Sequence, residues 1–188
     1  MNLTITTVQS DADIQGILAL QQQNLTRNLS AEVQLSQGFL TVAHDPAVLA
    51  RMNAAAPSII AKDGEQVVGY CLTMLPAFKA DVPALVPLFD LLDTLTYKAQ
   101  PLNQYAYYVM GQVCVAEGFR GQGLFDAMYH HHHEIYGDRY QLLVTDISGR
   151  NTRSLRAHLR VGFEALQTFD DPFTGELWTI VVWDWAIV

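Results

Sequence analysis

The sequence has few cysteines, few basic residues and no long apolar run. Its two cysteines, Cys71 and Cys114, lie in separate apolar stretches, with no CxxC spacing and no neighbouring ligand residue. They therefore predict buried free thiols in a reducing compartment, and neither a disulfide framework nor a zinc site. Lys and Arg number 11 against 19 Asp and Glu, which gives a net charge of −8. We expect no nucleic-acid partner, because nucleic-acid binding needs a basic surface that displaces counterions.

No segment has the pattern of a targeting or membrane-spanning element. Residues 1–10 lack the basic and then apolar regions of a signal peptide. The apolar stretch 178–188 is interrupted by Asp184 and is too short for a helix that crosses a bilayer. We therefore expect a cytoplasmic protein with no membrane partner.

The sequence is rich in apolar residues. They make up 50% of the chain, against 16% charged residues, a composition that supports a packed core and excludes a disordered chain. At 188 residues the chain is long enough for one such core. We expect a single domain that covers residues 1–188.

Local patterns in the first half predict strands and helices. Branched residues in 3–8 predict a strand, Ser10 then caps a helix, and Asp45 opens another helix. The Asp-Gly pair at 63–64 predicts a hairpin turn between two apolar strands. A helical leucine pattern over 85–95 predicts an inserted amphipathic helix.

The second half alternates strands and helices more regularly. Its patterns predict a strand, a helix, a strand, a helix and a closing strand pair, over residues 105–117, 123–136, 140–147, 151–162, 163–169 and 176–185. The predicted order along the chain is β-α-α-β-β-(α insert)-β-α-β-α-β-β. Such interleaving favours an α/β (α+β) fold in which helices flank a mixed sheet.

A glycine turn, Arg120-Gly121-Gln122-Gly123, joins the strand over 105–117 to the next helix. At such a junction, backbone N–H groups at the helix N-terminus form an anion site. The glycines permit a left-handed backbone and the close approach of a phosphate, and the arginine adds a charged donor. A tight connection with no ligand is the alternative. The turn matches neither the P-loop nor the dinucleotide fingerprint.

Two motifs in the second half resemble those of the GNAT superfamily of acyl-CoA-dependent N-acetyltransferases. The first is VCVAEGFRGQGLF at 113–125, an apolar strand followed by the R/Q-x-x-G-x-G/A turn that opens a helix. The second is NTRSLRAHLRVGF at 151–163, which matches the family pattern at Asn151, Ser154, Gly162 and Phe163. The two motifs follow each other in the family's order, with a helix and a strand between them.

The resemblance implies a GNAT-like fold, whose mixed and mostly antiparallel central sheet is flanked by helices. It implies acetyl-CoA as co-substrate, and direct transfer of the acetyl group, in a ternary complex, to a primary amine of a small molecule, peptide or protein. A non-catalytic acyl-CoA-binding regulatory domain is the alternative. The residues implied to contact acetyl-CoA are Val113, Cys114 and Val115 on the strand, Arg120, Gly121, Gln122, Gly123, Leu124 and Phe125 in the pyrophosphate loop, and Asn151.

Two residues are candidates for the implied catalytic chemistry. Asp146 lies where members that acetylate ribosomal-protein N-termini often place an acidic base, although a capping or surface carboxylate is the alternative. His158 lies where the family often has the tyrosine that protonates the departing thiolate. A histidine is only partly protonated at neutral pH, so it is a less secure acid than tyrosine. Phe125 also departs from the family's Gly or Ala, which predicts local repacking around the cofactor.

Two other regions of the sequence each allow two interpretations. Arg153, Arg156 and Arg160 share a helix face, which either meets the 3′-phosphate of the cofactor or is solvated. By resemblance, the acceptor pocket is expected near residues 25–40 and 76–104. The inserted helix either caps that pocket or forms the contact of a homodimer.

The helix over 123–136 contains four consecutive histidines, His130–His133. Successive helical residues point about 100° apart, so these four side chains cannot converge on one metal ion. We expect a partly exposed helix flank there and no metal cofactor.

Overall fold

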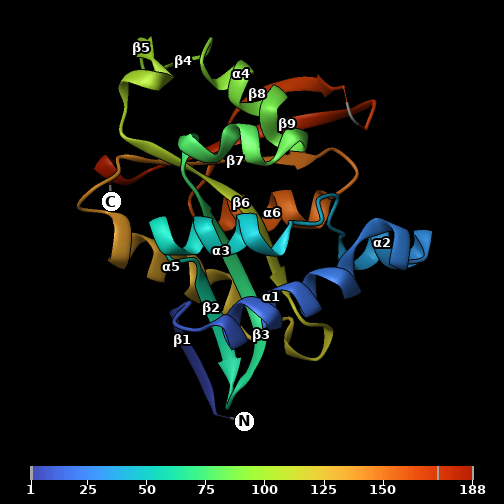
Figure 1. Cartoon of the computed structure of the whole chain (residues 1–188). Coiled ribbons are helices and arrows are strands. Elements are labelled where there is room, and N and C mark those ends of the chain that lie inside the picture. Colours follow the sequence, from blue (N-terminus) through green and yellow to red (C-terminus); the bar gives the residue numbers. More distant parts are fainter. Residues whose placement is uncertain (1, 173, 188) are drawn as a thin grey trace.

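The protein is built around one large twisted sheet with helices on both faces (Figure 1). The computed structural model describes residues 2–172 and 174–187. The strands are β1 (Leu3–Thr7), β2 (Ile59–Asp63), β3 (Gln66–Met74), β4 (Thr96–Tyr97), β5 (Gln100–Pro101), β6 (Tyr107–Val115), β7 (Leu142–Ser148), β8 (Glu164–Asp171) and β9 (Glu176–Asp184). The helices are α1 (Asp11–Asn24), α2 (Ala31–Gln37), α3 (Pro46–Ala55), α4 (Val86–Leu92), α5 (Leu124–Tyr136) and α6 (Thr152–Val161).

The large sheet has seven strands in the order β1-β2-β3-β6-β7-β9-β8. Neighbouring strands are antiparallel, except β6 and β7, which are parallel. This confirms the expected mixed and mostly antiparallel sheet. The strands β4 and β5 form a separate hairpin that the sequence did not predict, because each of them is only two residues long.

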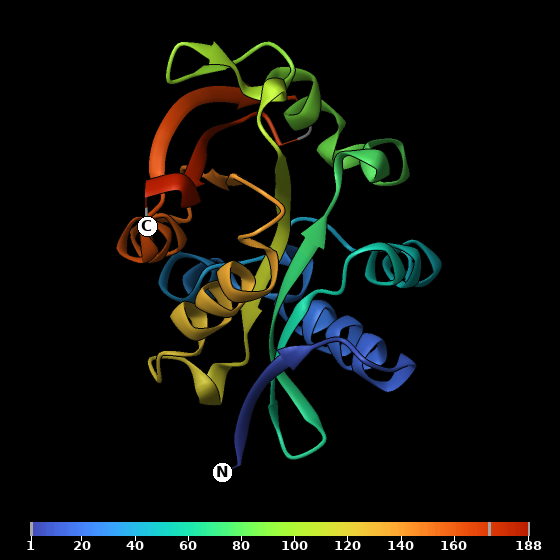
Figure 2. The same cartoon turned by 90° about the vertical axis from the view of Figure 1, so that its left-hand side faces the viewer.

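Helices cover both faces of this sheet (Figure 2). On one face α1 packs on β3 and on α3, and on the other face α5 packs on β2 and β3 beside α6. The predicted helix starts are confirmed: Ser10 and Asp13 form a reciprocal capping box at α1, and Asp45 caps α3. In the described parts of the chain, no helix is both long enough and apolar enough to cross a bilayer.

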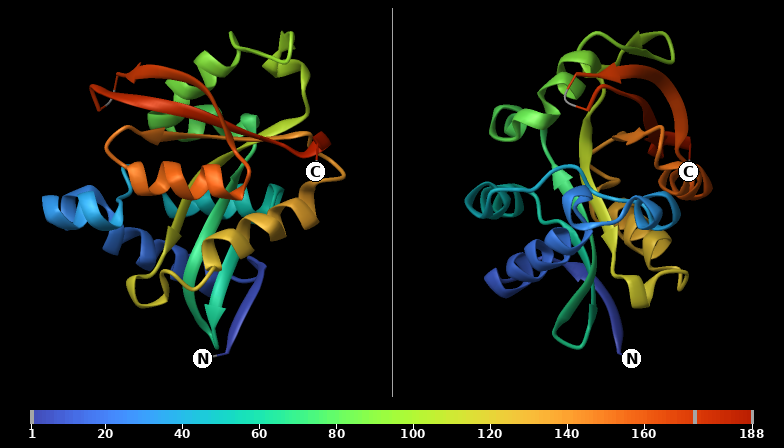
Figure 3. Two further views of the ribbon diagram at one scale, coloured as in Figure 1. Left: turned by 180° about the vertical axis from the view of Figure 1, so that it is seen from behind. Right: turned by 90° about the vertical axis from the view of Figure 1, so that its right-hand side faces the viewer.

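The strands β6 and β7 diverge soon after they meet. They pair only over Tyr107–Val109 and Leu142–Val144, although both strands continue. Immediately beyond this stretch Gly111 is an extra residue in the β3–β6 register, a bulge that bends β6. The Thr145 hydroxyl donates to the carbonyl of Met110 at 2.9 Å where the strands separate. Beyond this point β7, β9 and β8 curve away from the rest of the sheet (Figures 2 and 3).

The inserted helix is shorter than predicted. It is α4, and Leu85 belongs to a preceding 3₁₀ turn, Pro83–Leu85, while Leu95 lies beyond the end of the helix. Its apolar residues Leu88, Phe89 and Leu92 are buried in the chain's own core. The most apolar face of α4 is therefore packed within the same chain, while Val86 and Leu91 are half-buried.

The histidine run is only partly the exposed helix flank that the sequence predicted. His130 is exposed, but His132 is fully buried under the sheet. The Nδ1 atom of His132 lies 2.9 Å from the Tyr108 hydroxyl, and its Nε2 atom lies 3.3 Å from the Cys71 carbonyl oxygen. Burial lowers the pKa of His132 to about 3, so the ring is neutral and part of the core. His132 is buried because one residue in every turn of α5 faces the sheet, whatever its type.

Candidate functional site

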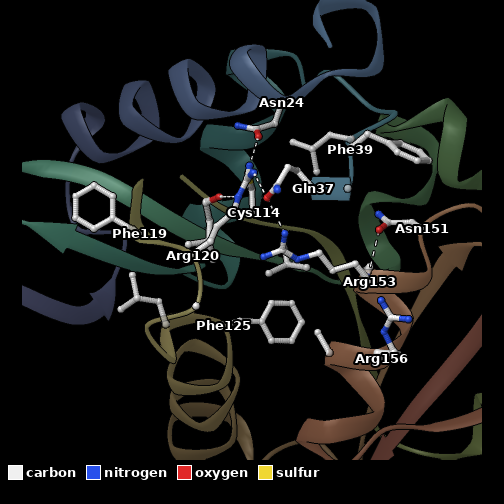
Figure 4. Close-up of a pocket in the computed structure, with 18 of the residues that line it drawn as sticks. Asn24, Gln37, Phe39, Cys114, Phe119, Arg120, Phe125, Asn151, Arg153 and Arg156 are labelled. Carbon is white, nitrogen blue, oxygen red and sulfur yellow. Dashed lines mark hydrogen bonds between the residues drawn. The ribbon is translucent and has the colours of Figure 1, made fainter. Parts of the chain in front are cut away.

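Two cavities lie beside the diverging parts of β6 and β7. The first has a volume of about 310 Å³. Among its described lining residues, the charged side chains are all arginines, so we call it the arginine-rich cavity: Arg120, Arg153, Arg156 and Arg160. Figure 4 labels the first three. The second has a volume of about 300 Å³, and we call it the carboxylate cavity after Asp146 and Asp171. The cavities share the walls Phe39, Leu40, Val113, Asn151 and Ser154, so they are two parts of one site.

The glycine turn forms one end of the arginine-rich cavity. Gly121 and Gly123 have φ angles of 74° and 80°, the left-handed conformation that the sequence predicted. Gly123 is also the N-cap of α5, whose first backbone N–H groups open toward this end. No described atom lies within 4 Å of where a Cβ on either glycine would stand. The turn therefore presents main-chain donors with room for an anionic group directly on the backbone.

The sequence suggested that Arg120 adds a charged donor at the turn, but its guanidinium is already hydrogen-bonded within the chain. Its Nε–H donates to the Val115 carbonyl at 2.9 Å, and Nη2 donates to Oδ1 of Asn24 at 2.8 Å. Its Nη1 donates to Oε1 of Gln37, which also accepts from Nη1 of Arg153 at 2.6 Å (Figure 4). Arg120 thus ties β6 to the ends of α1 and α2.

The other arginines differ in how far they are already paired. Arg160 forms two hydrogen bonds with Asp126, at 2.6 and 3.1 Å, and Arg153 is held by Gln37. Arg156 is exposed, and among the described residues it has no hydrogen-bond or ion-pair partner. Of the three arginines on this helix face, two are therefore already paired within the chain, and Arg156 is left to solvent or to an anionic ligand.

The predicted strand positions line the arginine-rich cavity, namely Val113, Cys114 and Val115. The Cys114 thiol is buried, and burial raises its pKa to about 12. It is therefore a neutral thiol at physiological pH and a poor nucleophile. The open part of β6 contributes its main chain to the cavity wall, where β7 has already turned away.

Most of the predicted loop positions also reach this cavity. Leu124, Phe125 and Asn151 line it with the two glycines. The Phe125 ring packs edge-on against His158 at 5.1 Å between centroids. Asn151 caps α6 by accepting from Ser154 N–H at 3.2 Å. Gln122 is exposed, lies outside the cavity wall, and donates to the Gly118 carbonyl.

Asp146 lies on the wall of the carboxylate cavity, on β7 next to β9. Burial, and secondly the charge of Asp171, raise its pKa to about 7. Asp171 ends β8 and is itself buried, with Oδ2 accepting from the N–H and the hydroxyl of Thr174 at 2.8 and 2.7 Å. Asp146 is therefore a carboxyl group whose protonation changes near neutral pH.

His158 lines the same cavity, but both of its ring nitrogens have partners. Nδ1 lies 2.8 Å from the Ser154 carbonyl oxygen, which can only accept, so Nδ1 carries the proton. Nε2 therefore accepts from the Tyr129 hydroxyl, at 2.6 Å. Burial lowers the pKa of His158 to about 4. At neutral pH the ring is uncharged and lacks the available N–H that a proton donor needs.

Sequence reasoning missed several side chains that build the site. The expected acceptor region is represented by Phe39, Leu40, Ala84 and Leu85, which line the carboxylate cavity. The β8–β9 hairpin was not foreseen there, and it contributes Asp171, Thr174 and Trp178. No local pattern distinguishes these residues from those of an ordinary hairpin, because the curvature of the sheet brings them to the cavity.

The described residues also bear on metal binding. They include no group of three or more His, Cys, Asp or Glu side chains placed to hold a metal ion. The four histidines of α5 point in different directions, and His131 is paired with Glu134 at 2.7 Å. The arginines of one cavity can bind an anion, and Asp146 in the other can exchange a proton near neutral pH.

No family model and no curated protein matches the chain. Solved structures do match it, across nearly the whole chain. The ribosomal-protein-S18-alanine N-acetyltransferase from Escherichia coli has a TM-score of 0.62 at 11% identity, with 97% of this chain and 93% of that chain covered. A putative acetyltransferase from Salmonella typhimurium, YncA with its cofactor acetyl-CoA, has a TM-score of 0.63 at 14% identity, with 98% and 95% covered. The NatC complex bound to Gag peptide and CoA has a TM-score of 0.66 at 11% identity, with 98% and 99% covered.

Proposed function

Because the chain has the fold of the GNAT N-acetyltransferases, we propose that it transfers an acetyl group from acetyl-CoA to a primary amine. The observation that carries the proposal is the meeting of two cavities of opposite charge where β6 leaves β7. One cavity suits a polyanionic cofactor, and the other suits a cationic acceptor. Their shared wall is where the two reacting groups would meet.

The arginine-rich cavity fits acetyl-CoA in several respects. The open backbone at Gly121 and Gly123 suits the pyrophosphate, and the exposed Arg156 suits a further phosphate. The open edge of β6 at Val113–Val115 offers main-chain groups to an amide-containing arm. The proposed cofactor contacts are therefore those implied by the sequence, with Gln122 set aside and Arg156 added.

Bound acetyl-CoA would supply the acetyl group as a thioester: a C–N bond forms, the C–S bond breaks, and the proton lost by nitrogen ends on sulfur. Asp146 is the proposed base that takes this proton from the amine, directly or through water. Its pKa of about 7 suits proton exchange at physiological pH. Cys114 is a neutral buried thiol and therefore a poor nucleophile for an acyl-enzyme, which supports direct transfer.

We give His158 a positioning role. It holds Tyr129 and the first turns of α6 in place beside Ser154, which lies on the wall shared by the two cavities. Its neutral state argues against the proton-donor role that its position in the motif implied. The sulfur would then take its proton from the acceptor side or from water.

The proposal is tested by two measurements on the full-length protein. Calorimetry should detect 1:1 binding of acetyl-CoA, and a thiol assay should detect CoA release that depends on an added primary amine. A panel of small amines and short peptides with a free N-terminus serves as acceptors. If acetyl-CoA does not bind, the proposal fails altogether.

A second candidate function is a CoA-binding regulatory domain without turnover. It is favoured by one observation, the neutral and fully paired His158 where the family often has a catalytic tyrosine. Tight binding of acetyl-CoA without CoA release for any acceptor would favour this second function.

A further inference from the structure

The carboxylate cavity has an unusual charge balance. The described residues that line it include the acids Asp146 and Asp171 and the neutral His158, and they include no Lys or Arg. Asp171 is buried, with only 8% of its surface exposed, and Asp146 is half-buried. Buried carboxylates are costly unless a cation or several donors compensate them.

The basic residues closest in sequence to this cavity are already paired elsewhere. Arg150 forms an ion pair with Glu176 at 2.7 Å, and Arg153 binds Gln37 on the other side of α6. Asp171 receives two hydrogen bonds from Thr174, which are neutral donors. Burial, and secondly the charge of Asp171, raise the pKa of Asp146. The described chain thus leaves the pair without a compensating positive charge.

The two acids lie at different depths along the site. Asp146 is on β7, which borders β6 and hence the shared wall. Asp171 is on β8, two strands further out, and no residue of β8 or β9 lines the arginine-rich cavity. A ligand that reaches from the shared wall into the carboxylate cavity would therefore meet Asp146 first and Asp171 at its outer end. Val42, Leu85 and Ile147 add apolar wall to the same cavity.

We propose, on the basis of the proposed acetyltransferase function, that the acceptor is an alkyl diamine, with its reacting nitrogen at Asp146 and its second ammonium group at Asp171. The methylene chain lies against the apolar wall. A monoamine compensates one acid and leaves the other buried without a countercharge, so the second ammonium provides the specificity. A cavity of about 300 Å³ suits a small molecule of this kind.

The test compares acceptors that differ only in the charge of the far end. The series is 1,4-diaminobutane, 4-amino-1-butanol and 4-aminobutanoate, which carry a cation, a neutral hydroxyl and an anion beyond the same four-carbon amine. We expect kcat/KM to fall in that order, by at least tenfold from the first to the second. Diamines of two to six carbons should show an optimum length.

The matched variants are D171N and D170N. The amide introduced by D171N keeps an oxygen that can accept from Thr174, so this variant should fold, and it should reduce the diamine-to-aminoalcohol ratio by at least tenfold. Asp170 is exposed and lies outside the cavity, so D170N changes the same charge and should keep the wild-type ratio. Calorimetry of 1,4-diaminobutane without acetyl-CoA gives a readout that is independent of turnover, and its binding should weaken in D171N alone.

The outcomes distinguish this inference from the proposed function. Equal rates for the diamine and the aminoalcohol, or faster acetylation of a peptide N-terminus than of any diamine, would overturn the diamine assignment and leave the acetyltransferase intact. If no amine is acetylated, the proposed function fails. The inference is then judged by calorimetry, where binding of the diamine that depends on Asp171 supports it and the absence of such binding overturns it.

Discussion

Asp146 and His158 line the same cavity, yet burial has different consequences for their chemistry. Burial disfavours the charged form of each, so the carboxyl gains a pKa of about 7 and the imidazole falls to about 4. The pKa of Asp146 therefore lies in the pH range where a base is useful, whereas the pKa of His158 lies below that range. The titratable groups facing Asp146 across the cavity are Asp171 and His158.

The ionisation of Asp146 should make turnover depend on pH. Asp146 must be ionised to act as a base, so kcat should rise with pH through about 7 and then level off. The variant Asp146→Asn should lose this limb and fall by roughly 10²–10⁴-fold in kcat. Asp171→Asn removes a neighbouring negative charge, so it should move the limb to lower pH. A limb that persists unchanged in Asp146→Asn would show that another group is the base.

A second prediction separates positioning from proton donation at His158. His158→Phe removes the acceptor of the buried Tyr129 hydroxyl, which should lower the free energy of unfolding by about 1–3 kcal/mol. The pH profile of kcat should keep its shape, since the neutral ring does not titrate in that range. Urea unfolding and a pH series measure the two effects. A stable variant that loses a limb of the pH profile would instead restore His158 as the acid.

At the element scale, the junction between β6 and α5 is the part of the site best predicted from sequence. A strand, two glycines and a helix start are local features, so the turn and its left-handed backbone were predictable. The route of Arg120 was not, because its partners Asn24 and Gln37 come from helices far away in the sequence. For the same reason the β8–β9 hairpin could be predicted as a hairpin but not as a cavity wall.

The glycine turn gives a prediction with a matched control. Gly123→Ala places a Cβ at φ 80°, which should cost about 1–2 kcal/mol of stability. The Cβ also enters the space left for the ligand, so the affinity for acetyl-CoA should fall by about tenfold or more. Gly64→Ala, at φ 59° in the β2–β3 turn, imposes similar strain away from both cavities. Equal losses of acetyl-CoA affinity in the two variants would remove the turn from the binding site.

At the scale of the whole molecule, three buried histidines link stability to pH. Burial lowers the pKa of His132 to about 3, and those of His44 and His158 to about 4. Their ordinary value is about 6.5, so below that pH the unfolded chain binds more protons than the folded chain. Their contribution to stability is therefore complete above about pH 6.5 and is lost as the pH falls. Asp146, with its raised pKa, acts in the opposite sense between its ordinary value and about 7.

We expect a net loss of about 2 kcal/mol in the free energy of unfolding between pH 7 and pH 5.5. Urea unfolding at several pH values measures it. His132→Gln should reduce the loss, whereas His130→Gln, which changes an exposed histidine of the same helix, should not. Asp146→Asn should increase the loss, because it removes the opposing group. A flat profile would contradict the buried, neutral state of these rings.

The divergence of β6 from β7 also has a consequence for aggregation. A strand with unpaired main-chain groups at the outer edge of a sheet is a template on which another protein chain can add. Here the unpaired stretch of β6 lies in the interior of the sheet, between β3 on one side and the curved arm of β7, β9 and β8 on the other. The outer edge strand β8 is mostly exposed and carries charged residues such as Glu164 and Asp170. The fold thereby leaves the main chain of β6 open to a slender ligand, and it prevents a second protein chain from adding to this strand.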